Sequence, residues 1–205
     1  MRVEKVARSD LSDLILHKHY ACRWPSVSFA FGLFDGEELL GGITYGTPSS
    51  APLRSGLLGP ELSSRVLELN RLCLYHNQKN EASYLIANSL KLLPGPRAIV
   101  SFADPSHGHV GTVYQACNFI YCGLSAKRTD WKVRGKEHMH GQTIADEFRG
   151  VKNRAAAMRE KYGDDFYLSP RPRKHRYVYF IGSKKERKEM FAALRYKQEG
   201  YPRHA

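Results

Sequence analysis

Residues 101–123 read SFADPSHGHVGTVYQACNFIYCG, and this stretch decides the fold of the chain. The apolar run Ala98–Val100 precedes it and predicts a buried strand, which Asp104-Pro105 ends because proline cannot continue the strand's hydrogen bonds. Apolar residues at helical spacing predict a short helix that starts near His109, and Phe119–Cys122 predicts another strand. This order places polar groups just beyond strand ends, where open α/β sheets build their sites.

Tyr114 lies on the apolar side of the predicted short helix and has two interpretations. It is either a core tyrosine whose hydroxyl finds a hydrogen-bond partner, or a general acid near the mouth of the sheet. The spacing alone favours the core tyrosine.

The size and composition of the chain limit the class of protein. A length of 205 residues with 42% hydrophobic content predicts one domain with additions, or one and a half domains. No apolar run is long enough to span a bilayer, and the first residues lack a signal-peptide core. The four cysteines form no CxxC pair and are typical of reduced core thiols, so we expect a protein of the cytoplasm without a membrane partner.

The positive charge is concentrated in the second part of the chain. The net charge is +12; residues 1–125 hold 11 Lys/Arg and 10 Asp/Glu, whereas residues 126–205 hold 21 and 10. Such an asymmetry is typical of a protein with a polyanionic partner, most simply nucleic acid. A solvated basic surface without a partner is the less favoured alternative.

The first half of the chain predicts a strand, a helix, a hairpin, a long strand and a second helix. The first strand is 2–6, and a helix that begins at Ser9 or Asp10 follows. Residues 28–34 and 39–45 form the hairpin around Asp35-Gly36, and 46–59 is expected to be a loop. In the long strand, 66–75, Glu68, Asn70 and Leu72 share one face and Leu67, Leu69 and Arg71 the other. Asn80 is expected to cap the second helix, which Leu93–Pro96 ends.

The second half adds a basic region, a strand and a last helix. Residues 144–163 look helical, and 177–181 is a clear strand. Ser183 with Glu186 three residues on predicts a capping box. The helix it starts should place Met190, Phe191 and Leu194 on one face and end at Gly200. The fold class is therefore mixed α/β, with one central sheet that carries helices.

A basic stretch with one aromatic residue follows Gly123. Cations interleaved with a tryptophan can contact phosphates and stack a base, although an ordinary exposed loop is an equally good interpretation. The candidate nucleic-acid-binding residues are Lys127, Arg128, Trp131, Lys132, Arg134 and Lys136.

Six of the nine histidines form pairs with one residue between them: His17/His19, His107/His109 and His138/His140. On a strand such a pair shares a face and can ligate one metal. No further zinc-type ligand pattern accompanies the pairs, so a metal ion, iron included, is not favoured. His107 and His109 are better interpreted as loop residues that move protons or contact DNA.

The order of elements resembles the GNAT acyltransferase fold, with residues 68–72 (ELNRL) as its central strand. Residues 101–105, 108–123 and 174–180 are more specifically similar to the Mom family of phage DNA-modification proteins. The resemblance covers roughly residues 26–182. It implies three parts: a catalytic core at 1–125, a basic substrate-binding insertion at 126–170, and a strand and helix at 171–205 that complete the core.

The resemblance implies that the chain converts adenine in double-stranded DNA to N6-(carbamoylmethyl)adenine, which protects phage DNA from restriction in the host cytoplasm. The family's functional positions match Ser101, Asp104 and Tyr114, and in GNAT relatives a tyrosine placed like Tyr114 is often the general acid. His107 joins them as a candidate catalytic residue. The candidate donor-binding residues are Arg71, Asn80, Gly111 and Thr112.

The turn that would bind the acyl donor departs from the GNAT pattern. GNAT enzymes usually cradle the CoA pyrophosphate in a glycine-rich turn that opens the helix after the long strand, but residues 76–82 (HNQKNEA) contain no glycine. The product also carries a second nitrogen that acetyl-CoA lacks. We therefore expect an activated acyl donor, with glycyl-tRNA favoured, tRNA as a second partner and acetyl-CoA as the alternative. The other function classes are acyl transfer to a tRNA or protein amine, and DNA binding without catalysis.

Overall fold

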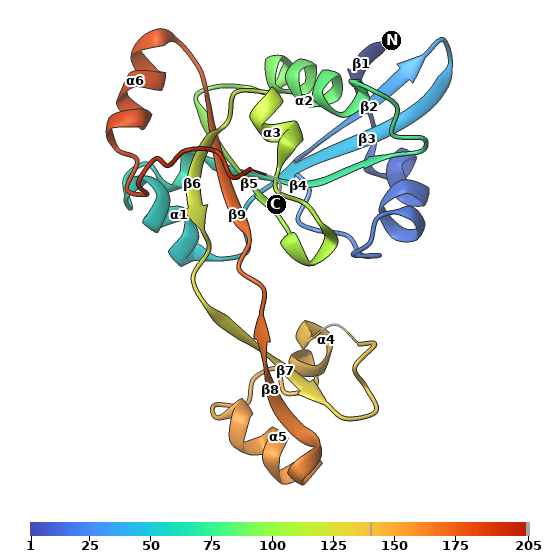
Figure 1. Ribbon diagram of the computed structural model, residues 1–205, viewed down its shortest axis with the longest axis vertical. Coiled ribbons are helices and arrows are strands. Elements are labelled where there is room, and N and C mark those ends of the chain that lie inside the picture. The colour runs from blue at the N-terminus through green and yellow to red at the C-terminus, as the bar shows by residue number, and fades with distance from the viewer. Residues whose placement is uncertain (140, 204–205) are drawn as a thin grey trace. The chain divides into compact units, whose positions relative to one another are not determined.

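The structure, a computed structural model, describes residues 1–139 and 141–203 and divides into two compact units (Figure 1). The core unit contains Met1–Leu124 and Lys174–Ala205, and the inserted unit contains Ser125–Arg173. Among the described residues no helix is long and apolar enough to cross a membrane.

The core unit is built on a seven-stranded sheet of order β1-β2-β3-β4-β5-β9-β6. Its neighbouring strands are antiparallel except β4 and β5, which are parallel. Helices cover it, so the mixed α/β class is confirmed. The strands are β1 (Arg2–Lys5), β2 (Phe29–Asp35), β3 (Glu38–Gly46), β4 (Val66–Leu74), β5 (Arg97–Ala103), β6 (Ile120–Leu124) and β9 (His175–Ile181).

Two hydrophobic clusters lie on opposite faces of this sheet because side chains alternate along a strand. Ile99 of β5 packs in the cluster beneath α2 and α3, whereas its neighbours Ala98 and Val100 pack in the cluster beneath α1 and α6. The helices are α1 (Ala51–Leu58), α2 (Glu81–Leu92), α3 (Thr112–Ala116) and α6 (Lys184–Ala192). Short turns η3 (Ser63–Arg65) and η4 (Pro105–His107) precede β4 and follow β5.

Three expectations for the position and type of the core-unit helices were wrong. The segment 46–59 contains α1, because the Ser50 side chain accepts a hydrogen bond from the Leu53 N–H at 3.3 Å and starts a helix with proline in its first turn. The N-terminal helix is the 3₁₀ turn η1 (Arg8–Leu11) followed by the π-helix η2 (Leu14–Lys18). Helix α6 has the predicted capping box but ends at Ala192 rather than Gly200, and Phe191 is 50% exposed.

The predicted faces of the long strand are correct only as far as Leu69. The register between β3 and β4 shifts at Thr44/Tyr45, where Thr44 pairs with Arg71 and Tyr45 pairs with Leu69. Asn70 is therefore an extra residue, and a bulge of this kind reverses the alternation beyond it. As a result Leu72 packs in the cluster that holds Leu67 and Leu69.

The inserted unit has its own small core. Strands β7 (Arg128–Val133) and β8 (Phe166–Arg171) form an antiparallel pair, and α4 (Gly141–Asp146), α5 (Arg154–Tyr162) and η5 (Gly163–Asp165) complete the unit. The single helix expected at 144–163 is thus wrong. Gly150 has a φ of 87°, and Asn153 begins a separate helix by accepting from the Ala156 N–H at 3.2 Å. The buried residues are Val133, Ile144, Phe148, Met158 and Phe166.

Candidate active site

The parallel strands β4 and β5 pair over only three residues. Val66–Glu68 pairs with Ala98–Val100, and no further pairs join the two strands in the described part of the chain. One step beyond, the buried Ser101 hydroxyl donates to the Leu69 carbonyl at 3.1 Å. The remainder of each strand therefore keeps backbone groups that the other strand does not satisfy, which is where a ligand can approach a parallel sheet.

Tyr114 reaches this opening from α3. Its side chain is 8% exposed and its ring packs between those of Phe119 and Tyr177, with centroids 5.4 and 5.3 Å away. Its hydroxyl hydrogen-bonds to Ser101. Burial raises the pKa of Tyr114 to about 12, and the Ser101 hydrogen bond opposes this increase in part. The hydroxyl thus keeps its proton at neutral pH and can donate it.

Glu68 is a carboxylate at the same opening, where β4 last pairs with β5, and its sequence context alone does not mark it as a site residue. Burial raises its pKa, and the charges of Arg71 and Lys174 oppose the increase. Glu68 also raises the pKa of Tyr114 electrostatically, although its side chain points away from the face of Leu67 and Leu69, which pack with Tyr114. A partly buried carboxylate with a raised pKa is a candidate general base at a catalytic site.

Aromatic side chains from the segment that follows η2 and from η4 meet beside the opening. Tyr20 stacks on His19 at 4.4 Å between ring centroids, and its ring is tilted against that of His107 at 4.3 Å. Tyr20 also raises the pKa of Tyr114 electrostatically. His19 is buried, and its Nδ1 accepts from the Ala21 N–H at 3.1 Å. Burial, assisted by the charge of Arg71, lowers the pKa of His19 to about 4, so its imidazole is neutral at pH 7.

Asp104 follows the end of β5 as predicted, and its carboxylate is engaged by Ser106 and Lys174. It accepts from the Ser106 N–H at 3.0 Å and from the Ser106 hydroxyl at 2.6 Å, and it pairs with Lys174 at 2.8 Å. Burial alone would raise the pKa of Asp104, but Lys174 and Ser106 outweigh it and lower the pKa to about 2. This geometry favours a turn-forming aspartate over a proton acceptor.

Two of the four candidate donor-binding residues lie on either side of the loop between β4 and α2. Arg71 donates to the carbonyl oxygens of Asn70 and Arg23 at 2.6 and 3.1 Å. Asn80 occupies the N-cap position of α2, but its φ is 70° and among the described residues its side chain makes no capping hydrogen bond, so the expected side-chain cap is wrong. Asn77 has a φ of 49°. These asparagines adopt the left-handed backbone that glycine usually supplies.

The N-terminus of α2 already holds an acidic group. Glu81 is 6% exposed, and its carboxylate accepts from the Gln78 N–H at 2.8 Å. A carboxylate there satisfies the positive end of the helix dipole and repels a pyrophosphate. The residues of this turn therefore do not fit the CoA pyrophosphate in the usual GNAT manner.

Gly111 and Thr112 begin α3, and the glycine has a packing role. Gly111 has a φ of 85°, and a Cβ at this position would lie 2.3 Å from the Tyr177 ring. The Tyr177 hydroxyl donates to the Val110 carbonyl and accepts from Gln115 at 3.1 Å. Gly111 thus lets Tyr177 approach the turn that orients α3 and Tyr114.

The cations of the basic stretch differ in how they are engaged within the inserted unit. Lys132, Arg134 and Lys136 donate to the Glu137 carbonyl, the Asp164 carbonyl and the Tyr162 hydroxyl at 3.3, 3.1 and 3.2 Å. Lys127 and Arg128 are exposed and form no ion pair or side-chain hydrogen bond with the described residues. They are the cations of the stretch that are free to meet phosphates.

Trp131 lies on the core face of the inserted unit. Its ring packs edge-on against Phe166 at 6.0 Å, and the side chain is partly buried. Arg128 and Lys132 point to the opposite face, because side chains alternate along β7. Trp131 therefore contributes to the core of the unit, and only its exposed part can contact a base.

The histidine pairs do not gather into a metal centre. No group of three or more His, Cys, Asp or Glu side chains that could hold a metal ion occurs in residues 1–139 and 141–203. His17 is exposed on η2 whereas His19 is buried, so they do not share a strand face. The rings of His107 and His109 are 6.4 Å apart. His138 is exposed, and His140 lies outside the described residues.

The sheet order and the separation of β4 from β5 around Tyr114 define a GNAT-like α/β protein, as the resemblance implied. The model of the Mom protein family matches residues 1–203, and the chain belongs to this family. The methylcarbamoylase mom of Escherichia phage Mu is 30% identical over 220 residues, which is 99% of this chain and 84% of that protein.

Solved acetyltransferases resemble the chain at lower similarity. A Bacillus subtilis acetyltransferase in complex with CoA is 14% identical, covers 88% of this chain and 99% of its own, and has a TM-score of 0.47. A GNAT-family acetyltransferase from Bacillus cereus is 12% identical, covers 89% and 98%, and has a TM-score of 0.46. At these scores the likeness carries no information about donor or substrate.

Proposed function

We propose that the protein modifies phage DNA by converting adenine to N6-(carbamoylmethyl)adenine, and that it acts in the cytoplasm of the host cell, where the product protects the DNA from restriction. Membership of the Mom family supports this proposal. The observation that carries the chemistry is the Tyr114 hydroxyl, held by Ser101 at the point where β4 and β5 stop pairing.

Tyr114 and Glu68 have complementary roles in the proposed reaction. Tyr114 keeps its proton at neutral pH and gives it to the leaving group of the donor. Glu68 takes the proton that the adenine amine loses, because its raised pKa makes it a better base than Asp104, whose pKa is about 2. Asp104 and Lys174 hold the turn that carries His107, and His107 contacts the substrate beside Tyr20.

The donor is an activated acyl group, and we favour glycyl-tRNA over acetyl-CoA on chemical grounds. Transfer of glycine to N6 gives an amide with a free amine. That amine attacks C6 through a five-membered intermediate, and expulsion of the original N6 as the amide nitrogen leaves a glycinamide on C6. The new C6–N bond replaces the old one, so no further nitrogen source is needed. The Glu81 carboxylate at the α2 N-terminus, where a CoA pyrophosphate would bind, supports this preference.

DNA is bound by residues 126–170, which we assign as the substrate-binding insertion. Lys127 and Arg128 contact phosphates, which fix position without reading sequence. A stacked adenine cannot expose its reacting nitrogen to a buried tyrosine, so the target base leaves the duplex.

Mass spectrometry of nucleosides tests the proposal. Plasmid DNA from cells that express the protein should contain N6-(carbamoylmethyl)adenine, and DNA from cells with Tyr114→Phe should not. If tRNA or protein is acylated and no new adenine species appears, the protein is instead an acyltransferase that acts on a tRNA or protein amine. If no adduct of any kind is found, the protein binds DNA without catalysis. Purified protein that forms the product from acetyl-CoA and DNA, with no other nitrogen source, would exclude the glycyl donor.

A further inference from the structure

One face of α6 carries three cations and an exposed aromatic ring. Lys184, Arg187, Lys188 and Phe191 recur at i, i+3, i+4 and i+7, which places them on one side of the helix. Together with Val178–Phe180 of β9 they line a surface pocket of about 340 Å³, a volume within the range of small-ligand sites. The Phe191 ring packs edge-on against the buried Phe180 ring at 6.3 Å between centroids, and half of its side chain remains exposed.

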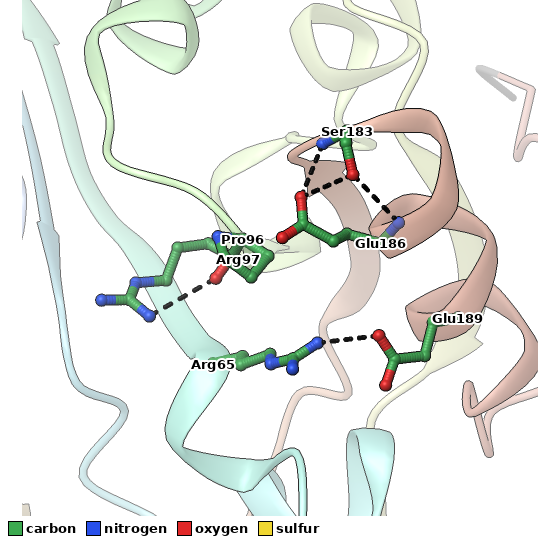
Figure 2. Close-up of polar contacts among 6 residues, drawn as sticks. All are labelled: Arg65, Pro96, Arg97, Ser183, Glu186 and Glu189. Carbon is green, nitrogen blue, oxygen red and sulfur yellow. Dashed lines mark hydrogen bonds and ion pairs between the residues drawn. The ribbon is translucent and has the colours of Figure 1, made fainter.

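The acidic residues of α6 do not line this pocket and are engaged in other contacts (Figure 2). Glu186 accepts from the Ser183 N–H and hydroxyl at 2.7 and 2.8 Å, and Glu189 pairs with Arg65 at 3.1 Å. Lys184, Arg187 and Lys188 form no ion pair or side-chain hydrogen bond within residues 1–139 and 141–203. The contacts in Figure 2 therefore fix the helix while its cations stay available to an anion.

The pocket is separate from the candidate active site. The pocket's cations and Phe191 lie on α6, which packs on the sheet face of Ala98 and Val100, whereas Tyr114 packs on the opposite face with Ile99. In the sheet order β5 also lies between β4 and β9, the strand that lines the pocket. A group bound by α6 would therefore not share the opening between β4 and β5.

The positive charge of the second part of the chain is divided between the inserted unit and the last segment of the core unit. Residues 125–173 hold 12 Lys/Arg and 7 Asp/Glu, a net of +5, and residues 174–205 hold 9 and 3, a net of +6. The core unit thus carries a basic segment of its own, and α6 supplies four of its nine cations.

We propose that the α6 pocket binds an unpaired nucleotide of single-stranded DNA, with its phosphates at Lys184, Arg187 and Lys188 and its base against Phe191. A positive groove with an aromatic platform is the arrangement by which proteins hold single strands, because every base has a face that can stack. The choice of DNA rather than RNA rests on the proposed function. The inference that the pocket binds a nucleotide rests instead on the cations and the aromatic ring that line it.

Binding of a fluorescein-labelled dT octamer to the full-length protein, measured by anisotropy at several salt concentrations, tests the site. Arg187→Gln with Lys188→Gln should flatten the slope of log affinity against log salt by about 1.4, because each phosphate contact on a single strand contributes about 0.7. Phe191→Ala should weaken binding roughly 5- to 150-fold, which corresponds to the loss of one stacked base.

The matched control is Lys185→Gln with Lys197→Gln, which removes two exposed cations of the same segment that do not line the pocket. Equal weakening by the control would overturn the proposal, as would a dT octamer affinity that Phe191→Ala leaves unchanged. An RNA octamer bound tenfold more tightly than the DNA octamer would overturn the choice of DNA. Thermal unfolding of each variant verifies that the fold is intact.

Photocrosslinking locates the contact directly. A 5-iodouracil octamer irradiated with the wild-type protein should modify the tryptic peptide of residues 189–195, which contains Phe191. Crosslinks confined to residues 125–173 would contradict the proposal. Neither assay contains a donor or measures a product, so failure of the pocket and failure of the proposed reaction are distinguished.

Discussion

Tyr114→Phe separates chemistry from folding because the substitution removes a single oxygen atom. The ring contacts with Phe119 and Tyr177 remain. The Ser101 hydroxyl still donates to the Leu69 carbonyl, so no buried donor loses its partner. The loss is then one net hydrogen bond, about 0.5–1.5 kcal/mol in the free energy of unfolding. If Tyr114 is the proton donor, DNA modification should fall roughly 10²–10⁴-fold.

The core contains a matched control for this substitution. The Tyr45 hydroxyl lies 2.7 Å from the Ser89 hydroxyl, and Ser89 donates to the Ile86 carbonyl at 3.0 Å. Both tyrosines thus hydrogen-bond to a buried serine that donates to a backbone carbonyl. Tyr45→Phe should cost a similar free energy of unfolding and leave modification nearly unchanged.

The assay compares the two variants in the same cells. Nucleoside mass spectrometry gives the fraction of adenine modified, and urea unfolding of the purified proteins gives the loss of stability. If Tyr114→Phe retains near-normal modification, or if both variants lose activity in proportion to stability, Tyr114 is a core tyrosine and the assigned mechanism fails. Because the pKa of Tyr114 is about 12, the wild-type rate should show no ionisation of this group near neutral pH.

Four further predictions concern charged groups. Glu68→Gln should reduce DNA modification at least 10²-fold. Thermal melts should show no loss of stability, because a carboxylate whose pKa is raised on folding destabilises the fold when it is ionised. Reduced stability with normal activity would contradict the role of Glu68 as a base. Asp104→Asn should cost about 1–2 kcal/mol at pH 7. Its folded pKa is about 2, below the ordinary 3.8, so wild-type urea unfolding should lose this contribution as the pH falls from about 4 to 2; a loss of activity with unchanged stability would instead favour a chemical role. His19 has a folded pKa of about 4, below 6.5, so stability should fall by about 1–3 kcal/mol between pH 6.5 and 4, and His19→Gln should remove that dependence; an unchanged pH profile would argue against it. Lys127→Gln with Arg128→Gln should reduce the salt slope of duplex binding by about 1.8, and an unchanged slope would place the phosphates elsewhere.

Hydrophobic periodicity and capping residues were sufficient to predict most of the core. The long strand and the Ser183–Glu186 capping box were found because their signals are local in the sequence. Helix α1 was missed because a segment rich in Ser, Pro and Gly is typical of a loop, although Ser50 followed by Pro52 is also a helix start. The bulge at Asn70 depends on pairing with β3, so the sequence of β4 alone could not predict it.

The candidate site was only partly predictable for the same reason. Ser101 and Tyr114 lie within one quoted stretch, and the structure brings them into contact. His19 and Tyr20 follow η2 and Glu68 lies in β4, and only the tertiary fold gives them their surroundings in the candidate site. Glu68 had a local signal, a carboxylate between two leucines of a strand, but this pattern also fits a solvent-facing residue.

The pairing of β6 with β9 has a consequence for how the inserted unit can vary. Leu124 and His175, which bracket residues 125–173, face each other as neighbours in the core sheet. The sheet therefore already holds the two ends of the insertion together, and an exchange of the insertion adds little loop-closure entropy. The segment can thus be exchanged as a module while Tyr114 and the strands around it stay the same.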